Sequence, residues 1–63
     1  MNYRKARREA QHHAKIVGNP TVVANVASEG GFVWVEHRFA YIMGANNENI
    51  ITRFDENGKE DRT

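Results

Sequence analysis

The fold is decided at residues 18–27, which read GNPTVVANVA. Gly18 and Asn19 tolerate the left-handed backbone conformation that ends helices, and Pro20 cannot continue a helix. The residues after Pro20 are rich in β-branched side chains, which favour strands. The sequence therefore predicts a change from helix to strand at this point.

Residues 2–17 predict a single helix on the N-terminal side of this stop. Apolar side chains recur there at spacings of three and four residues, without an intervening Gly or Pro, at Tyr3, Ala6, Ala10, Ala14 and Val17. The stripe consists largely of alanine, which lets another backbone come close. We expect it to pack on the sheet of the same domain; a helix contact across a dimer is the alternative.

The C-terminal side predicts strands at residues 21–27, 32–43 and 50–55 and a tail at residues 56–63. Asn57-Gly58 is a frequent hairpin pair, so residues 59–62 form either a short fourth strand or a frayed tail. No repeat or linker divides the chain. The sequence thus predicts one α+β domain over residues 1–63, with an N-terminal helix packed on a three-stranded or four-stranded antiparallel β-meander.

The predicted strand at residues 32–43 is apolar on both sides, and a single helix covers only one face of a sheet. Phe32 and Trp34 share one side of this strand. Either they turn inward as core residues, or they remain exposed as a protein interface, for which tryptophan is a frequent hot spot. Both alternatives stay open, and we take Phe32 and Trp34 as the candidate protein-interface residues.

Positive charge is concentrated in the N-terminal third. The net charge is +1, but residues 1–20 contain five Lys or Arg against one Glu, whereas the remainder contains four against seven acidic residues. The five cations are Arg4, Lys5, Arg7, Arg8 and Lys15. On a helix they form a surface able to neutralise nucleic-acid phosphates. The alternative is an ordinary solvated helix face, which agrees with an isoelectric point of only about 8.2.

Several classes of site lack their residues. There is no cysteine, which excludes disulfides and thiolate metal sites. His12 and His13 are adjacent and point about 100° apart on a helix, so they do not chelate one ion. Ser28 lacks a nucleophile motif. We expect no enzyme activity, metal, cofactor or small-molecule substrate.

Apolar runs are too short to cross a bilayer, and a cysteine-free chain suits a cytoplasmic protein. A domain of 63 residues without a covalent support is marginal alone. We therefore expect a homodimer that also binds an unidentified protein, of the type of the small accessory proteins of phages and prophages. Residues 21–27 are the expected exposed edge for an added strand. Nucleic acid is the alternative partner.

Overall fold

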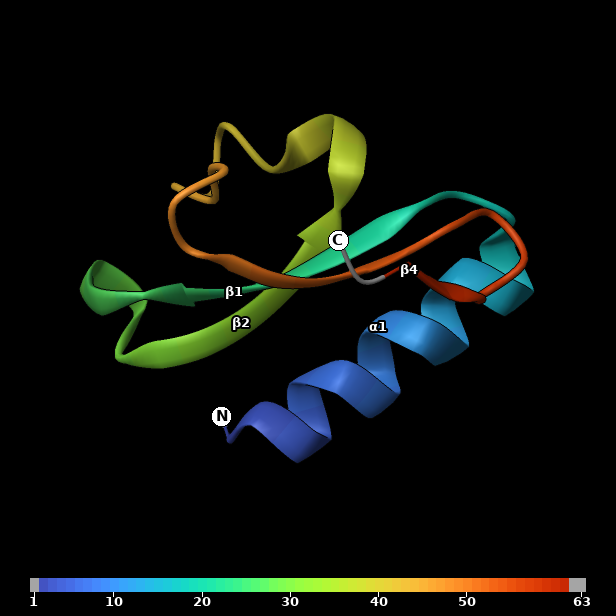
Figure 1. Ribbon diagram of the computed structural model, residues 1–63, viewed down its shortest axis with the longest axis horizontal. Coiled ribbons are helices and arrows are strands. Elements are labelled where there is room, and N and C mark those ends of the chain that lie inside the picture. The colour runs from blue at the N-terminus through green and yellow to red at the C-terminus, as the bar shows by residue number, and fades with distance from the viewer. Residues whose placement is uncertain (1, 62–63) are drawn as a thin grey trace.

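The computed structural model describes residues 2–61. One helix packs on a four-stranded antiparallel sheet (Figure 1). The main elements are α1 (Tyr3–Val17), β1 (Thr21–Val26), β2 (Gly31–Glu36), β3 (Ile50–Phe54) and β4 (Glu60–Asp61), with short 3-10 helices η1 (Ala27–Glu29) and η2 (His37–Phe39). The predicted α+β fold class is confirmed.

α1 ends at Val17, as predicted, and begins at Tyr3, one residue after the predicted start. The side chain of Asn2 accepts a hydrogen bond of 2.8 Å from the Lys5 backbone amide at its start. At its end Gly18 has φ 81° and donates its amide to the Ala14 carbonyl. The expected alanine stripe is fully buried against the sheet. Because alanine is small, Thr21 Oγ1 of β1 reaches the Ala10 carbonyl at 2.9 Å.

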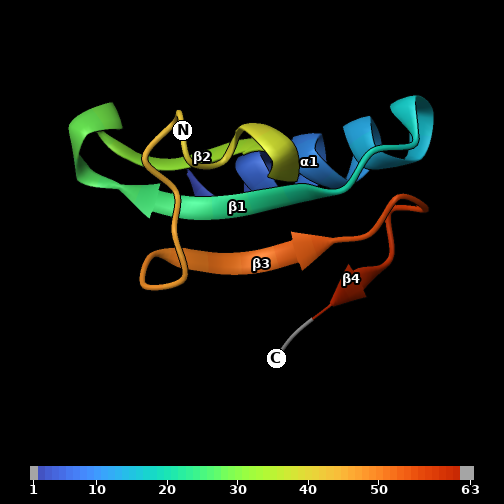
Figure 2. The ribbon, with the colours of Figure 1, turned by 90° about the horizontal axis from the view of Figure 1, so that it is seen from above.

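The sheet order is β2-β1-β3-β4, so β1 lies between β2 and β3. A sequential meander would instead place β2 between β1 and β3. Residues 37–49 leave β2 and cross the face opposite α1, and β3 therefore joins the far side of β1 (Figure 2). The expectation that residues 21–27 form an exposed edge is wrong, because β1 is paired on both sides.

β2 ends at Glu36, seven residues before the predicted end at Met43. The last contact of its ladder is the His37 amide, which donates to the Pro20 carbonyl at 2.8 Å. Beyond His37, β2 has no neighbouring strand on the β1 side, because the chain before Pro20 turns away into α1. The segment after Glu36 therefore folds into η2 and turns instead of extending the strand.

The two faces of the sheet have separate cores. On the α1 side, Val23 and Phe54 pack with the buried alanines and with partly buried Tyr3, Phe32 and Trp34. On the other side, Ala40 and Ala45 of the crossing segment cover apolar residues of β1, with residues of β2 and β3 at the margin. The crossing segment thus takes the place of a second helix.

The Asn57-Gly58 turn forms and is followed by β4, which gives the sheet its fourth strand. Arg62, the end of the predicted fourth strand, lies outside the described residues. The turn contacts α1, since Gln11 Nε2 donates to the Gly58 carbonyl at 2.9 Å. Gly58 has φ 77°, and an added Cβ would collide with the Lys15 side chain and approach the Gln11 carbonyl oxygen to 3.2 Å. Glycine is therefore required here.

Candidate interaction surfaces

The five predicted cations do not act as one group. Arg4, Lys5, Arg8 and Lys15 are exposed, whereas Arg7 is half buried. Arg7 Nε donates to Glu60 Oε1 at 3.0 Å, and its guanidinium carbon lies 5.5 Å from the centre of the Phe54 ring. Arg7 therefore joins α1 to β4 and has a structural role.

Three of the four remaining cations lie along one side of α1. Among residues 2–61, the side chains of Arg4 and Arg8 make no hydrogen bond or ion pair. They line an open groove together with Tyr3, Arg7 and Gln11. Lys15 follows on the same side of the helix, roughly 16 Å from Arg4 at 1.5 Å of rise per residue, with its stem over Gly58. We call Arg4, Arg8 and Lys15 the basic stripe.

Phe32 and Trp34 point toward α1, not toward solvent. The ring of Phe32 meets that of Tyr3 edge-on at 5.5 Å, and the ring of Trp34 lies 4.9 Å from that of His13. Trp34 Nε1 also donates to Glu9 Oε1 at 3.0 Å. Both side chains are partly buried, so a partner would meet their backbone at the edge of β2 and only part of their side chains.

Large apolar side chains are exposed on the crossing segment. Phe39, Tyr41 and Ile42 are 43%, 91% and 77% exposed, and we call them the apolar patch. The sequence analysis placed these residues on the second strand and therefore missed the patch. The polar residues 44–49 mark the end of an element, but no local signal shows that β2 has already ended at Glu36.

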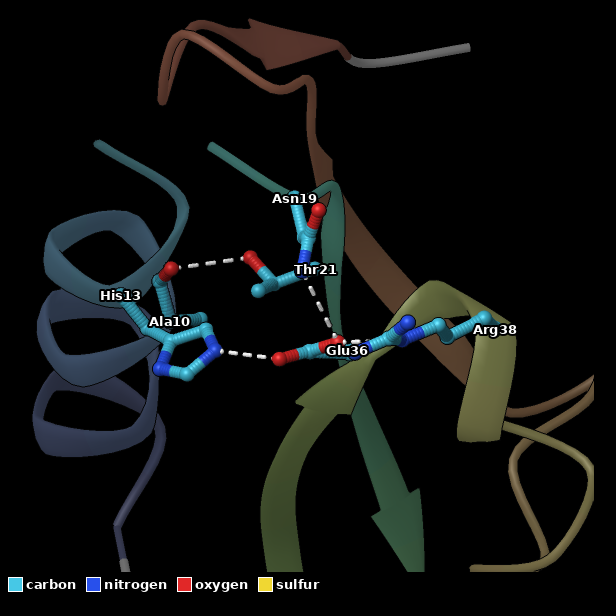
Figure 3. Close-up of polar contacts among 6 residues, drawn as sticks. All are labelled: Ala10, His13, Asn19, Thr21, Glu36 and Arg38. Carbon is cyan, nitrogen blue, oxygen red and sulfur yellow. Dashed lines mark hydrogen bonds and ion pairs between the residues drawn. The ribbon is translucent and has the colours of Figure 1, made fainter. Parts of the chain in front are cut away.

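Glu36 connects three parts of the fold (Figure 3). Glu36 Oε2 lies 2.7 Å from His13 Nε2 of α1, and Oε1 accepts hydrogen bonds from Arg38 Nε at 2.7 Å and Asn19 Nδ2 at 3.3 Å. The His13 hydrogen bond, followed by the Arg38 hydrogen bond and charge, lowers the pKa of the Glu36 carboxyl, against the raising effect of partial burial. The cluster fastens the end of β2 to α1. Sequence reasoning missed it because 23 residues separate His13 from Glu36.

A cavity of about 190 Å³ lies between the chain entering β1 and the β3–β4 end of the sheet. His37, Arg53, Asp55 and Asp61 are among its lining residues. Ligand pockets usually measure about 300–1,000 Å³, so this one is small. In the described part of the chain, His, Asp and Glu form no group of three able to hold a metal ion.

Comparisons with protein-family models, curated proteins and solved structures gave no match for this chain. No helix within residues 2–61 is long and apolar enough to cross a membrane.

Proposed function

We propose that the chain is a non-enzymatic protein-interaction module that self-associates and binds another protein through the apolar patch. The observation that carries this proposal is the exposure of Tyr41 and Ile42, which are neighbours on the surface of a very small domain. Exposed apolar groups that lie together are typical of binding sites. Tyrosine also supplies a large contact area at a small cost in side-chain entropy.

The backbone holds the patch in place before any partner arrives. The amide of Ile42 donates to the Phe39 carbonyl at 3.1 Å, and the amide of Ala45 donates to the Ala40 carbonyl at 2.9 Å. Ala40 and Ala45 are themselves buried against β1. A site that is ordered in advance loses less entropy on binding, so this segment is suited to recognition.

The experiment places a photo-reactive amino acid at Tyr41 and, as a control, at exposed Ile51 on β3. Proteins that cross-link to the probe at position 41 but not to the probe at position 51 are identified by mass spectrometry. They are then purified and titrated with the unlabelled protein. We expect the double variant Tyr41→Ser/Ile42→Ser to weaken binding by tenfold or more, whereas Ile16→Ser at the exposed end of α1 leaves it unchanged. Equal affinities of both variants and the unmodified chain would contradict the proposal.

The basic stripe favours a second candidate function, the binding of nucleic acid. Its specific support is that Arg4 and Arg8, one helical turn apart, are exposed and unpaired among the described residues. Their charges are free to displace counterions from phosphates. Arg7, which lines the same groove, is paired with the Glu60 carboxylate, and this pairing reduces the local positive charge.

Fluorescence anisotropy with labelled single-stranded and duplex DNA at several salt concentrations tests this candidate. Each phosphate contact adds about −0.9 to the slope of log affinity against log salt on duplex DNA. The variant Arg4→Gln/Arg8→Gln should reduce the magnitude of that slope by up to about 1.8, while Lys59→Gln, at an exposed cation elsewhere, should not. An absence of binding at low salt would remove nucleic acid as a partner.

A further inference from the structure

β2 is an edge strand of the sheet. The N–H and C=O groups of successive residues point alternately toward β1 and away from it. The His37 amide bonds to the Pro20 carbonyl, and hydrogen-bonded positions alternate along an antiparallel ladder. With the observed register, residues 31, 33 and 35 turn their N–H and C=O groups toward β1. Phe32 and Trp34 therefore direct theirs outward, where no strand within residues 2–61 pairs with them.

This outer edge lacks the features that normally prevent strand addition. Proteins protect sheet edges with Pro, charged side chains, bulges or very short strands. Residues 31–35 contain no Pro and no charge, and β2 pairs with β1 in regular register at all six positions. The opposite edge differs, because β4 has two residues and both are acidic. The two edges thus contrast, and β2 is the one open to extension.

We infer that a second copy of this chain adds to the β2 edge, in antiparallel orientation and around a two-fold axis through Val33. Phe32 of each copy then lies opposite Trp34 of the other, so that their outward N–H and C=O groups form four hydrogen bonds. The two sheets become one continuous eight-stranded sheet with both helices on the same face. This inference rests on the self-association part of the proposed function.

The chemistry of β2 selects this register. Pairing around Trp34 instead would place the Glu36 carboxylate opposite Phe32, an apolar ring. Pairing around Val33 leaves Glu36 outside the paired segment, where it keeps its hydrogen bonds to His13 and Arg38. It also places two aromatic residues opposite each other, a favourable cross-strand pair.

Charges on α1 favour a second copy over an unrelated strand. Tyr3 contacts Phe32 and Glu9 contacts Trp34, so the turn between Lys5 and Glu9 lies beside Val33. Figure 1 shows α1 alongside β2 and pointing in the same direction. Lys5 is four residues before Glu9 and thus on the same flank of α1. A two-fold axis through Val33 makes the helices antiparallel and places Lys5 of each copy opposite Glu9 of the other.

Amide hydrogen exchange of the unmodified protein, measured with light scattering between about 10 μM and 1 mM, is the primary test. We expect a dimer at the upper concentrations, with protection of the Phe32 and Trp34 amides that increases with concentration. The Val33 and Val35 amides, which face β1, should be protected at every concentration.

Cysteine cross-linking tests the two-fold axis, because the chain has no cysteine of its own. Val33→Cys should form a disulfide-linked dimer under mild oxidation, whereas Ile51→Cys on exposed β3 should remain monomeric. Lys5→Glu should weaken association by tenfold or more, and Lys59→Glu, an equal charge change elsewhere, should not. Since Val33 also contacts the core, circular dichroism of Val33→Cys establishes that the variant is folded.

The outcomes separate this inference from the proposed function. A dimer in which the Phe32 and Trp34 amides exchange freely refutes pairing at β2 but leaves self-association intact. A monomer at 1 mM refutes both pairing at β2 and self-association. Binding of another protein through the apolar patch is tested separately, by the Tyr41 and Ile42 variants. Protection of Phe32 and Trp34 only after another protein is added refutes the second copy as the occupant of this edge.

Discussion

Replacement of Gly58 by alanine measures how much the close approach of the β3–β4 turn to α1 contributes to stability. Gly58 has φ 77°, and an L-residue in this conformation costs roughly 1–2 kcal/mol. The new Cβ also meets the Lys15 stem, which is flexible, and the Gln11 carbonyl oxygen at 3.2 Å, which belongs to the helix backbone. Overpacking of this kind costs about 1–3 kcal/mol. We therefore expect Gly58→Ala to lower the free energy of unfolding by about 2–5 kcal/mol.

Gly30→Ala is the matched control. Gly30 has φ 83°, and nothing lies within 4 Å of an added Cβ, so this variant carries the backbone strain without the collision. A domain of this size has a total stability of roughly 3–9 kcal/mol, and each kcal/mol shifts its melting temperature by about 4–8 °C. Thermal and urea unfolding, followed by circular dichroism and the fluorescence of Trp34, compare the two variants. Equal destabilisation by both would refute the argument that the turn needs glycine for its contact with α1.

Three further changes test the interior. Tyr3→Phe removes the 2.6 Å hydrogen bond to buried Thr52 Oγ1, so urea unfolding should show a loss of about 1–3 kcal/mol. Ala10→Leu inserts a large side chain where α1 touches the sheet and should lower the melting temperature by more than Tyr3→Phe does. Hydrogen bonds lower the pKa of Glu36 in the folded state. The ionised Glu36 carboxylate therefore adds to the free energy of unfolding above the usual glutamate pKa of 4.5, and this contribution is lost as the pH falls through the folded-state pKa. Stability measured against pH should therefore depend less on acid in Glu36→Gln than in the unmodified chain.

The features that sequence predicts correctly are those that local chemistry determines. The end of α1 follows from Gly18 and Pro20. Asn57-Gly58 indicates the turn but leaves a fourth strand and a frayed tail both open, and the structure shows the strand β4. The buried alanine stripe follows from its spacing alone. Each of these features depends on a few neighbouring residues, so no knowledge of distant contacts is needed.

The features that sequence does not predict depend on contacts between distant segments. β2 ends at Glu36 because its neighbouring strand begins after Pro20, which the composition of residues 32–43 does not reveal. Four of the five cations on α1 are exposed, but Arg7 pairs with Glu60, which is 53 residues away, and local sequence does not reveal that contact. The apolar patch is exposed because residues 37–49 cross the sheet instead of extending β2, and the local sequence does not reveal that crossing.

The three candidate surfaces lie on different sides of the domain, and this decides how they can be used together. The basic stripe is on the outer side of α1, the apolar patch is on the opposite face of the sheet, and the free edge belongs to β2. Pairing at β2 covers neither of the other two, so each copy in a dimer would keep its patch and stripe. A dimer would then present two patches on one face, and a partner with two matching sites would bind more tightly than to a monomer because its second contact is intramolecular. Disruption of the edge by Lys5→Glu should weaken such a partner's binding without altering the patch itself, whereas a partner with one site should bind the unmodified chain and Lys5→Glu equally.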